Sequence, residues 1–446
     1  MNPSTRKLFL CLLLALLPGA VLFAQTDPQW AKEDVLSDPT RWGGTFGMYP
    51  EGQPLPPRPP NGYKPFYISH MGRHGARFVD GSQFYPKMYG IWKTADEKGL
   101  LTPEGKKFFE AYAEVYPRML YHEGILTQKG QRQHRQIADQ IYRNYPEIFK
   151  GKTQLVALST ESSRVIVSML CCLDELSDLD RDLTIQVDYG RPYYSMLIPE
   201  SHSNPNYKPM EPFTEEALDK YERFAKAVFD EEGVIGRWFT STEGIGLDRE
   251  SFMYDMMQLV SDCSNLDFPV PSALTDVFTP EERYAIWRVQ NYSDYMYTGV
   301  APGVDRRRFL EMSVAAKDII DRFEEDQANG VSLRMRYSHD TALAPLISYL
   351  GINGMDAMIS DPYEVEKVWR SYEIPMACNI QLVFFRSRKA PDEILIQVLL
   401  NGFCATLPMW TGLDQLMKDY LSRFTLQSLI DQAPPQPELA DLPVPD

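Results

Sequence analysis

Six short runs of β-branched and aromatic residues, each bounded by polar or turn-forming residues, set the main limit on how this chain folds. They lie at residues 65–71, 153–159, 183–188, 332–338, 379–386 and 394–400. Helical periodicity separates the early runs: Ile137, Ile141 and Tyr145 share one face of a helix. This alternation predicts an α/β fold with a mostly parallel, six-stranded sheet and helices on both faces. The short segment 387–393 predicts an antiparallel hairpin between the last two strands.

Between residues 191 and 330 the strand signals stop and helix starts recur. Capping residues precede periodic runs at Thr214, Thr279 and Asp305. The segment therefore predicts a helical cap domain inserted into an α/β core. The expected organisation is a signal peptide at 1–24, an N-terminal extension with a proline-rich connector at 25–62, a core at 63–190 and 331–432, a cap at 191–330 and a proline-rich tail at 433–446.

The N-terminal residues have the pattern of a secretory signal peptide. Arg6 and Lys7 precede an apolar stretch from Leu8 to Phe23, and Ala24 follows at a suitable cleavage site. We therefore expect an exported protein, periplasmic or secreted. No later stretch is apolar over the ~20 residues that a bilayer-spanning helix needs, so no membrane span is expected after cleavage.

Charge and cysteine content narrow the partners and cofactors. The formal net charge is −16, and it becomes −18 when residues 1–24, which carry two basic and no acidic residues, are removed. Nucleic acid is therefore not an expected partner, and the sequence assigns no oligomeric state. Of six cysteines one lies in the signal segment, and the odd remainder is not a disulfide framework, although one bridge is possible. No Cys or His spacing indicates zinc or iron, so no cofactor is expected.

The segment SHMGRHGARF, residues 69–78, carries the strongest functional signal. It follows the first predicted strand, at the carboxyl end where open α/β sheets bind ligands. Arg73 and Arg77 flank His74, and two guanidinium groups beside one imidazole lower its pKa and keep it neutral and nucleophilic. The same groups fit phosphate oxygens, while the glycines let the backbone approach an anion. The alternative is a basic turn whose arginines pair with acidic neighbours.

Two further strand ends contribute polar groups. His339 and Asp340 follow the fourth predicted strand. A histidine can donate a hydrogen bond to phosphate, and an aspartic acid can protonate a departing alkoxide. Arg164 lies at the start of the helix after the second strand. Each of these alone has an ordinary structural explanation, but strands of one sheet deliver complementary phosphate-binding groups to the same edge.

Together, RHGARF, STESSR and SHDTAL resemble motifs of the histidine phosphatase superfamily. They resemble in particular the branch of the histidine acid phosphatases, which includes phytases and multiple inositol polyphosphate phosphatases. The resemblance extends from about Tyr63 to about Gly402 and implies a phosphoglycerate mutase-like fold. It places the catalytic nucleophile on His74 and the proton donor on Asp340. The groups that it implies for binding the substrate phosphate are Arg73, Arg77, Arg164 and His339.

A further segment supports this resemblance, and two departures qualify it. LTQKGQRQ is similar to the family's LTxxGxxQ segment, with matches at Thr127, Gly130 and Gln133. Val79 stands where the family motif RHGxRxP has proline, and Leu158 replaces an arginine that often precedes Ser-Thr. Neither change removes a reacting atom. The His-Asp pair resembles acid phosphatases and bacterial phytases, whereas many inositol polyphosphate phosphatases have His-Ala-Glu.

The resemblance implies a phosphoric monoester hydrolase that works in two steps on a small phosphomonoester. His74 attacks phosphorus while the arginines and His339 hold the oxygens, and Asp340 protonates the leaving alcohol. Water then cleaves the phosphohistidine, with the same aspartate as the base. Because arginines meet the charge, no metal is required. Three alternatives stay open: a phytase or inositol polyphosphate phosphatase specifically, a phosphomutase, and a non-catalytic phosphate-binding protein.

Other basic residues are given no part in the site. The histidines at positions 70, 122, 134 and 202 have no ligand-like spacing. We interpret each of them as a surface residue or a hydrogen-bonded structural residue. The arginine run 306–308 lies at a helix start and is interpreted as solvated.

Overall fold

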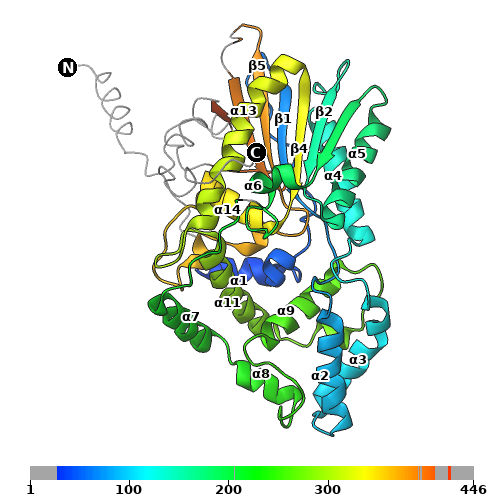
Figure 1. Ribbon diagram of the computed structural model, residues 1–446, viewed down its shortest axis with the longest axis vertical. Helices are drawn as coiled ribbons and strands as arrows, with labels where there is room; N and C mark the ends of the chain where they lie inside the picture. The colour runs from blue at the N-terminus through cyan, green and yellow to red at the C-terminus, as the bar shows by residue number, and fades with distance from the viewer. Residues whose placement is uncertain (1–27, 205, 390, 392–393, 407–419, 423–446) are drawn as a thin grey trace, which may run out of the picture.

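The computed structural model describes residues 28–422 apart from 205, 390, 392–393 and 407–419. Its centre is one mixed β-sheet, in the upper half of Figure 1, with strand order β3-β2-β4-β1-β5-β6-β7 and with β8 paired to β6. The strands are β1 Tyr63–Arg73, β2 Gln154–Ser159, β3 Thr184–Tyr189, β4 Val331–Ser338, β5 Asn379–Ser387, β6 Ile394–Leu400, β7 Phe403–Cys404 and β8 Tyr420–Ser422. Each of the six predicted runs therefore contains a strand.

The prediction of a mostly parallel six-stranded sheet is wrong, because the sheet is mixed and has further strands. β1, β2, β3 and β4 run parallel, whereas β5 is antiparallel to β1 and β6 is antiparallel to β5. The hairpin of β5 and β6 is the one that their short connection predicts. β7 and β8 add to β6, and strands of two and three residues are too short to show a period in the sequence. The periodicity of a buried strand also gives no sign of its direction, so β5 could not be oriented.

Helices flank the sheet and form a second layer below it in Figure 1. The α-helices of the described residues are α1 Pro28–Ser37, α2 Phe84–Glu97, α3 Pro103–Met119, α4 Gln128–Asn144, α5 Ser163–Leu179, α6 Tyr194–Leu197, α7 Glu215–Val228, α8 Glu231–Trp238, α9 Phe252–Asp262, α10 Ser272–Thr275, α11 Pro280–Thr298, α12 Arg307–Glu311, α13 Ser313–Asn329 and α14 Asp340–Leu350. The short 3-10 helices are η2 Arg41–Phe46, η3 Arg191–Tyr193, η4 Cys263–Asn265, η5 Ile352–Gly354, η6 Val365–Lys367 and η7 Ser371–Glu373.

Both faces of the sheet are covered by helices, as predicted. α4 and α5 pack together on one face, in an apolar cluster that includes Ile68 of β1 and Leu333 of β4. α13 and α14 pack on the other face, in a cluster that includes Tyr67 of β1. Tyr67 and Ile68 enter different clusters because successive strand residues point to opposite faces.

The helical layer away from the sheet joins distant parts of the chain. α2 and α3, which precede β2, share an apolar cluster with α8 and α9 around Trp92 and Trp238. Thr214 and Thr279 cap α7 and α11, and the hydroxyl of each accepts a backbone N–H at 3.2 Å. The third predicted start, at Asp305, leads into the short α12, and the α13 that follows packs on the sheet. α2 and α3 come from the segment assigned to the core, so the division into core and cap remains a proposal.

Some predicted segments lie outside the described residues, namely the signal peptide 1–24 and the tail 433–446. Within the connector, residues 51–59 form neither helix nor strand, as their prolines predict. Among the described residues, the cysteines at positions 171, 172, 263, 378 and 404 form no disulfide. In the part of the chain that the structure describes, no helix is both long and apolar enough to cross a bilayer.

Candidate active site

The parallel pairing of β1 and β4 brings the two histidine motifs together. Arg73, at the end of β1, is the register partner of Ser338, at the end of β4. The backbone N–H of His74 donates to the carbonyl of Ser338 at 3.0 Å. The imidazole rings of His74 and His339 therefore lie with their centroids 5.5 Å apart and their planes inclined by 71°. Two histidines that are far apart in the sequence share one site.

Arg73 and Asp340 form an ion pair beside these rings. Nη2 of Arg73 donates to Oδ2 of Asp340 at 2.9 Å. Nη1 of the same guanidinium group donates to the carbonyl of Ile374 at 3.0 Å and to the carbonyl of Thr45. The arginine is fully buried. It is thus fixed by three segments of the chain, and it in turn holds the carboxylate at the start of α14.

Arg77 and Arg164 complete a set of three guanidinium groups. Nη1 of Arg77 donates to the carbonyl of Phe78 at 2.8 Å. Arg164, at the start of α5, forms an ion pair in which Nη2 lies 2.8 Å from Oδ2 of Asp80. Both arginines act on the pKa of His74. Arg73 and His339 act on it as well, so the four predicted basic groups lie near this imidazole.

The surroundings keep His74 neutral and orient its ring. Burial, followed by the three guanidinium groups with Arg73 first, lowers the pKa of this imidazole well below its usual range. Nδ1 of the ring lies 2.9 Å from the carbonyl oxygen of Gly75. Because a carbonyl oxygen only accepts, Nδ1 carries the proton. Nε2 of the neutral ring therefore has a free lone pair and is the nucleophilic atom.

His339 and Asp340 also have low pKa values. Burial and then Arg164 lower the pKa of His339 to about 3, against the opposing effect of Asp340. Oγ1 of Thr160 lies 3.3 Å from Nε2 of His339 and orients that ring. Burial alone would raise the pKa of Asp340, but the nearby arginines, Arg73 first, and His339 hold it below its usual range. The free site thus combines neutral imidazoles with an ionised carboxylate.

The turn that follows β1 is held by α4 and α5. The N–H of Ala76 donates to Oε1 of Gln133 at 2.8 Å, and the N–H of Gly75 donates to Oγ of Ser168 at 3.0 Å. Gly75 also touches Gly130, since a Cβ at Gly75 would lie 2.5 Å from the carbonyl oxygen of Gly130. Two positions of the LTQKGQRQ segment therefore fix the turn that presents the nucleophile.

Sequence analysis did not identify Asp80, Thr160 or Ser168 as parts of the site. Single serine, threonine and aspartate residues carry no local signal, because their partners come from other strands and helices. Val79, which departs from the motif's proline, donates its N–H to the hydroxyl of Tyr85 at 2.9 Å. Proline has no N–H and could not form this bond. The departure therefore adds a contact that anchors the loop after the first motif.

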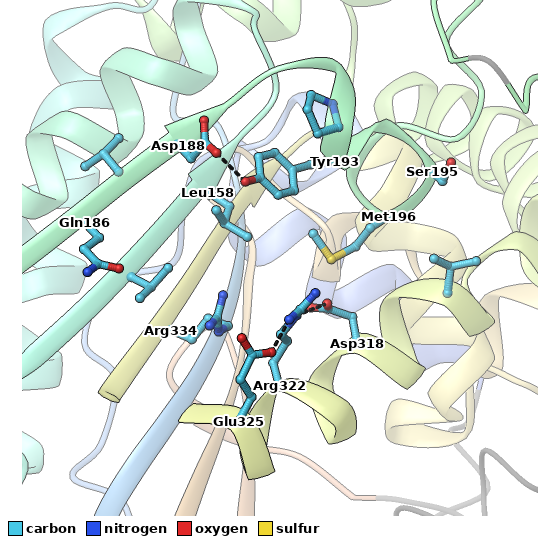
Figure 2. Close-up of a pocket in the computed structure, with 14 residues that line it drawn as sticks. Leu158, Gln186, Asp188, Tyr193, Ser195, Met196, Asp318, Arg322, Glu325 and Arg334 are labelled. Atoms are coloured by element: carbon cyan, nitrogen blue, oxygen red, sulfur yellow. Dashed lines mark hydrogen bonds and ion pairs between the residues drawn. The ribbon is translucent and has the colours of Figure 1, made fainter. Parts of the chain in front are cut away.

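A cavity of about 600 Å³ lies over β2, β3 and β4 between α6 and α13 (Figure 2). Several of its polar side chains pair with one another. Tyr193 donates to Asp188 at 2.5 Å, and Arg322 donates to Asp318 at 3.3 Å, as the dashed lines in Figure 2 show. None of the six predicted site residues lines this cavity. We therefore place the candidate active site at the ends of β1 and β4.

Comparisons with known proteins give a family match and a set of structures with a similar fold. Residues 69–171 match the model of the histidine phosphatase superfamily (branch 2). No curated protein matches the chain. A structure of the Bifidobacterium longum multiple inositol polyphosphate phosphatase with inositol hexasulfate has a TM-score of 0.67 at 14% identity, over 87% of this chain and 97% of that one.

Two phytase structures are also similar. The D. castellii phytase has a TM-score of 0.65 at 13% identity, over 89% of this chain and 85% of that one. The Hafnia alvei phytase with myo-inositol hexakis sulphate has a TM-score of 0.53 at 10% identity, over 86% of this chain and 100% of that one. At these identities the likenesses show the fold. The family match confirms the resemblance that the motifs indicate and, with it, a phosphoric monoester hydrolase.

Proposed function

We propose that this chain is an exported histidine acid phosphatase that hydrolyses phosphomonoesters through a phosphohistidine on His74, with Asp340 as the proton donor. One observation supports this above all others: the rings of His74 and His339 lie 5.5 Å apart among three guanidinium groups. A phosphoryl group bound there would meet a neutral nucleophile and several forked donors at once.

The first step is the attack of Nε2 of His74 on phosphorus. An N–P bond forms while the bond from phosphorus to the ester oxygen breaks. The proton on Nδ1 stays hydrogen-bonded to the carbonyl of Gly75, 2.9 Å away, which stabilises the positive charge that the ring gains. The arginines and His339 hold the other phosphate oxygens and offset the charge that spreads over them.

Asp340 has to carry a proton when the ester oxygen leaves. In the free site the arginines and His339 hold its pKa low, against the effect of burial. A bound phosphate dianion offsets the guanidinium charge and so raises the pKa of this carboxyl. Acidic solution then favours the protonated form, which gives its proton to the leaving oxygen. In the second step the resulting carboxylate takes a proton from the water that attacks the phosphohistidine, and the site returns to its starting state.

An inositol polyphosphate, with phytate first, is the leading specific substrate among phosphomonoesters. Two structures of similar fold were determined with inositol hexasulfate or myo-inositol hexakis sulphate, which are sulfate analogues of phytate. The His-Asp pair of this chain favours a broader phosphomonoesterase instead, because it resembles the acid phosphatase pattern. We therefore propose activity on several organic phosphates that includes phytate.

Free-phosphate release by the purified protein tests this function. Phytate, a sugar phosphate and an aryl phosphate are compared at several acidic pH values, with His74→Ala as the control for contaminating activity. We expect release by the wild type and none above background by the variant. Equal release by both proteins would show that His74 is not the nucleophile. Phosphate that stays in the pool of esters would indicate a phosphomutase, and phosphate binding without turnover would indicate a binding protein.

Export is proposed from the N-terminal segment alone. Arg6, Lys7 and the apolar stretch up to Ala24 have the order of a signal peptide. Expression of the full chain in a bacterial host should yield mature protein outside the cytoplasm, with its first residue after Ala24 identified by mass spectrometry. Full-length protein retained in the cytoplasm would contradict export without affecting the catalytic proposal.

A further inference from the structure

Asp80 places a negative charge beside a site built for an anion. Its side chain is about half exposed, at 49%, and Oδ2 lies 2.8 Å from Nη2 of Arg164. Its other oxygen, Oδ1, accepts the backbone N–H of Gly81 at 2.9 Å. A carboxylate in this position repels a bound phosphate. We therefore looked for a contribution of Asp80 to phosphate binding that is larger than this repulsion.

The backbone around Gly124 is shaped to admit this ion pair. Gly124 has a φ of +72°, a conformation that other residues rarely adopt. A Cβ at this position would lie 2.7 Å from Oδ1 of Asp80 and 3.5 Å from Nη1 of Arg164. The N–H of Gly124 donates to the carbonyl of Val79 at 2.9 Å, which holds the loop against the residue before Asp80. Glycine is thus required here both for its conformation and for the space that it leaves.

Arg164 differs from the other two arginines in what holds it. Arg73 and Arg77 each donate to backbone carbonyls, of Ile374 at 3.0 Å and of Phe78 at 2.8 Å respectively. Arg164 is anchored instead by the half-exposed carboxylate of Asp80. An arginine side chain has many rotamers, and an anchor reduces the freedom that it loses when it binds phosphate.

We propose that Asp80 is a positioning residue, which holds the guanidinium group of Arg164 in place to receive the substrate phosphate. The inference rests on the proposed function, because it assigns Arg164 to that phosphate. A guanidinium group has five N–H donors, so an ion pair through one nitrogen leaves others free for phosphate oxygens. The gain from a prearranged donor exceeds the repulsion from one partly exposed carboxylate.

A double-mutant cycle tests whether Asp80 acts through Arg164. Asp80→Ala is made in the wild type and in Arg164→Ala, and the Kd of inorganic phosphate is measured by calorimetry for all four proteins. In the wild type we expect the substitution to weaken binding by roughly 10-fold or more. In Arg164→Ala we expect no loss, or a small gain, because only the repulsion is removed. With an aryl phosphate as substrate, Asp80→Ala should raise KM more than it lowers kcat.

Three further variants separate position from charge. Gly124→Ala keeps both charges and pushes the pair apart, so it should weaken phosphate binding in the same direction as Asp80→Ala. Asp80→Glu retains the carboxylate and should recover part of the loss. The matched control is Asp174→Asn, which breaks another arginine ion pair of α5, in which Nη1 of Arg135 lies 2.7 Å from Oδ2 of Asp174. This control should leave the Kd of phosphate unchanged.

Two outcomes would overturn the inference. An equal loss of affinity from Asp80→Ala in both backgrounds would mean that the substitution damages the loop rather than displacing Arg164. Tighter phosphate binding in both backgrounds would mean that Asp80 only repels the anion. The cycle measures binding and needs no turnover, so a failure of this inference can be told apart from a failure of the proposed function. In the second case the wild type would bind phosphate but release none from any ester.

Discussion

His70 and His74 are separated by three residues, and each belongs to a pair of buried histidines. His74 pairs with His339 at the edge of the sheet, with ring centroids 5.5 Å apart. His70 on β1 and His134 on α4 both contact the ring of Tyr337, with centroids at 5.5 and 5.6 Å. We refer to these as the site pair and the inner pair.

Both pairs are held neutral, but for different reasons. Burial is the largest cause that lowers the pKa of His70 and of His134 to about 3. At His74 three guanidinium groups add to the effect of burial. The site pair also bonds to Gly75 and Thr160, whereas no ring nitrogen of the inner pair has a hydrogen-bond partner among the described residues. A low pKa alone therefore does not identify a nucleophilic histidine. What identifies it is a set of nearby donors that can bind an anion, together with a hydrogen bond that fixes the proton on the ring.

The largest predicted effect separates the two pairs by activity. His74→Ala should lower kcat by roughly 10⁴-fold or more, because it removes the nucleophile. His70→Leu removes an imidazole from β1 and should leave kcat within about 10-fold, because none of the three site arginines is among the groups that shift the pKa of His70. Phosphate release from an aryl phosphate is measured, and circular dichroism checks that each variant is folded. Comparable losses in both variants would contradict the distinction.

The second prediction concerns the carboxylate of Asp340. Among the described residues, it lies beside the site pair, and the inner pair has no such neighbour. Asp340→Asn keeps the shape of the side chain and removes the proton that it delivers. We expect kcat to fall by about 10²–10⁴-fold for an alkyl phosphate. The loss should be smaller for an aryl phosphate, whose leaving oxygen needs less protonation. A loss that is the same for both substrates would assign Asp340 to holding Arg73, its 2.9 Å partner, rather than to proton transfer.

The third prediction uses the inner pair. Its pKa values of about 3 lie below the unfolded value of about 6.5. The unfolded state therefore binds more protons between these limits, and stability is present above pH ~6.5 and falls as the pH falls toward 3. For each histidine the free energy of unfolding should decrease by about 1.4 kcal/mol per pH unit in that window. His134→Leu should reduce the slope by about this amount in urea titrations at several pH values.

A surface histidine supplies the control for that slope. His202 is exposed, so His202→Leu should keep the wild-type dependence of stability on pH. If His134→Leu keeps it as well, the inner pair is not the source of the acid sensitivity. Where His134→Leu does not fold, the titration of the two ring signals by NMR in the wild type gives the same answer.

Local signals predicted much of this fold, and long-range pairings did not follow from them. Thr214 and Thr279 were identifiable as caps because a cap and its helix are adjacent in the sequence. The antiparallel direction of β5 and the packing of α2 and α3 against α8 and α9 depend on partners that are far away in the chain. No period or capping residue encodes such partners.

In the candidate site, too, local signals were predictive and partners from distant parts of the chain were not. His74 and His339 could be brought together from the sequence because parallel strands place their carboxyl ends at one edge. Asp80 could not be placed there, since its partner Arg164 comes from α5, far away in the chain. The interpretation of His70 and His134 as surface or hydrogen-bonded residues is wrong, since each is 1% exposed and their ring nitrogens have no hydrogen-bond partner among the described residues. Both lie among residues whose burial depends on the packing of α4 against the sheet.

The smallest predicted effect comes from the removal of one hydrogen bond, which makes the site pair more similar to the inner pair. Thr160, directly after β2, lies 3.3 Å from Nε2 of His339 through its hydroxyl. Thr160→Val keeps the shape of the side chain and frees the ring to rotate. One neutral hydrogen bond corresponds to about 1 kcal/mol, so kcat/KM should fall by roughly 5-fold.

Thr153, directly before β2, provides the matched control at the other end of the strand. Both threonines are 1% exposed, and the hydroxyl of Thr153 donates to the carbonyl of Ile148 at 2.9 Å. Thr153→Val therefore removes a comparable buried bond and should cost comparable stability, while kcat/KM stays at the wild-type value. If both variants lose activity in proportion to stability, the orientation of His339 does not depend on Thr160. If only Thr160→Val loses activity, the hydrogen bond to the ring of His339 is part of what distinguishes the site pair from the equally buried inner pair.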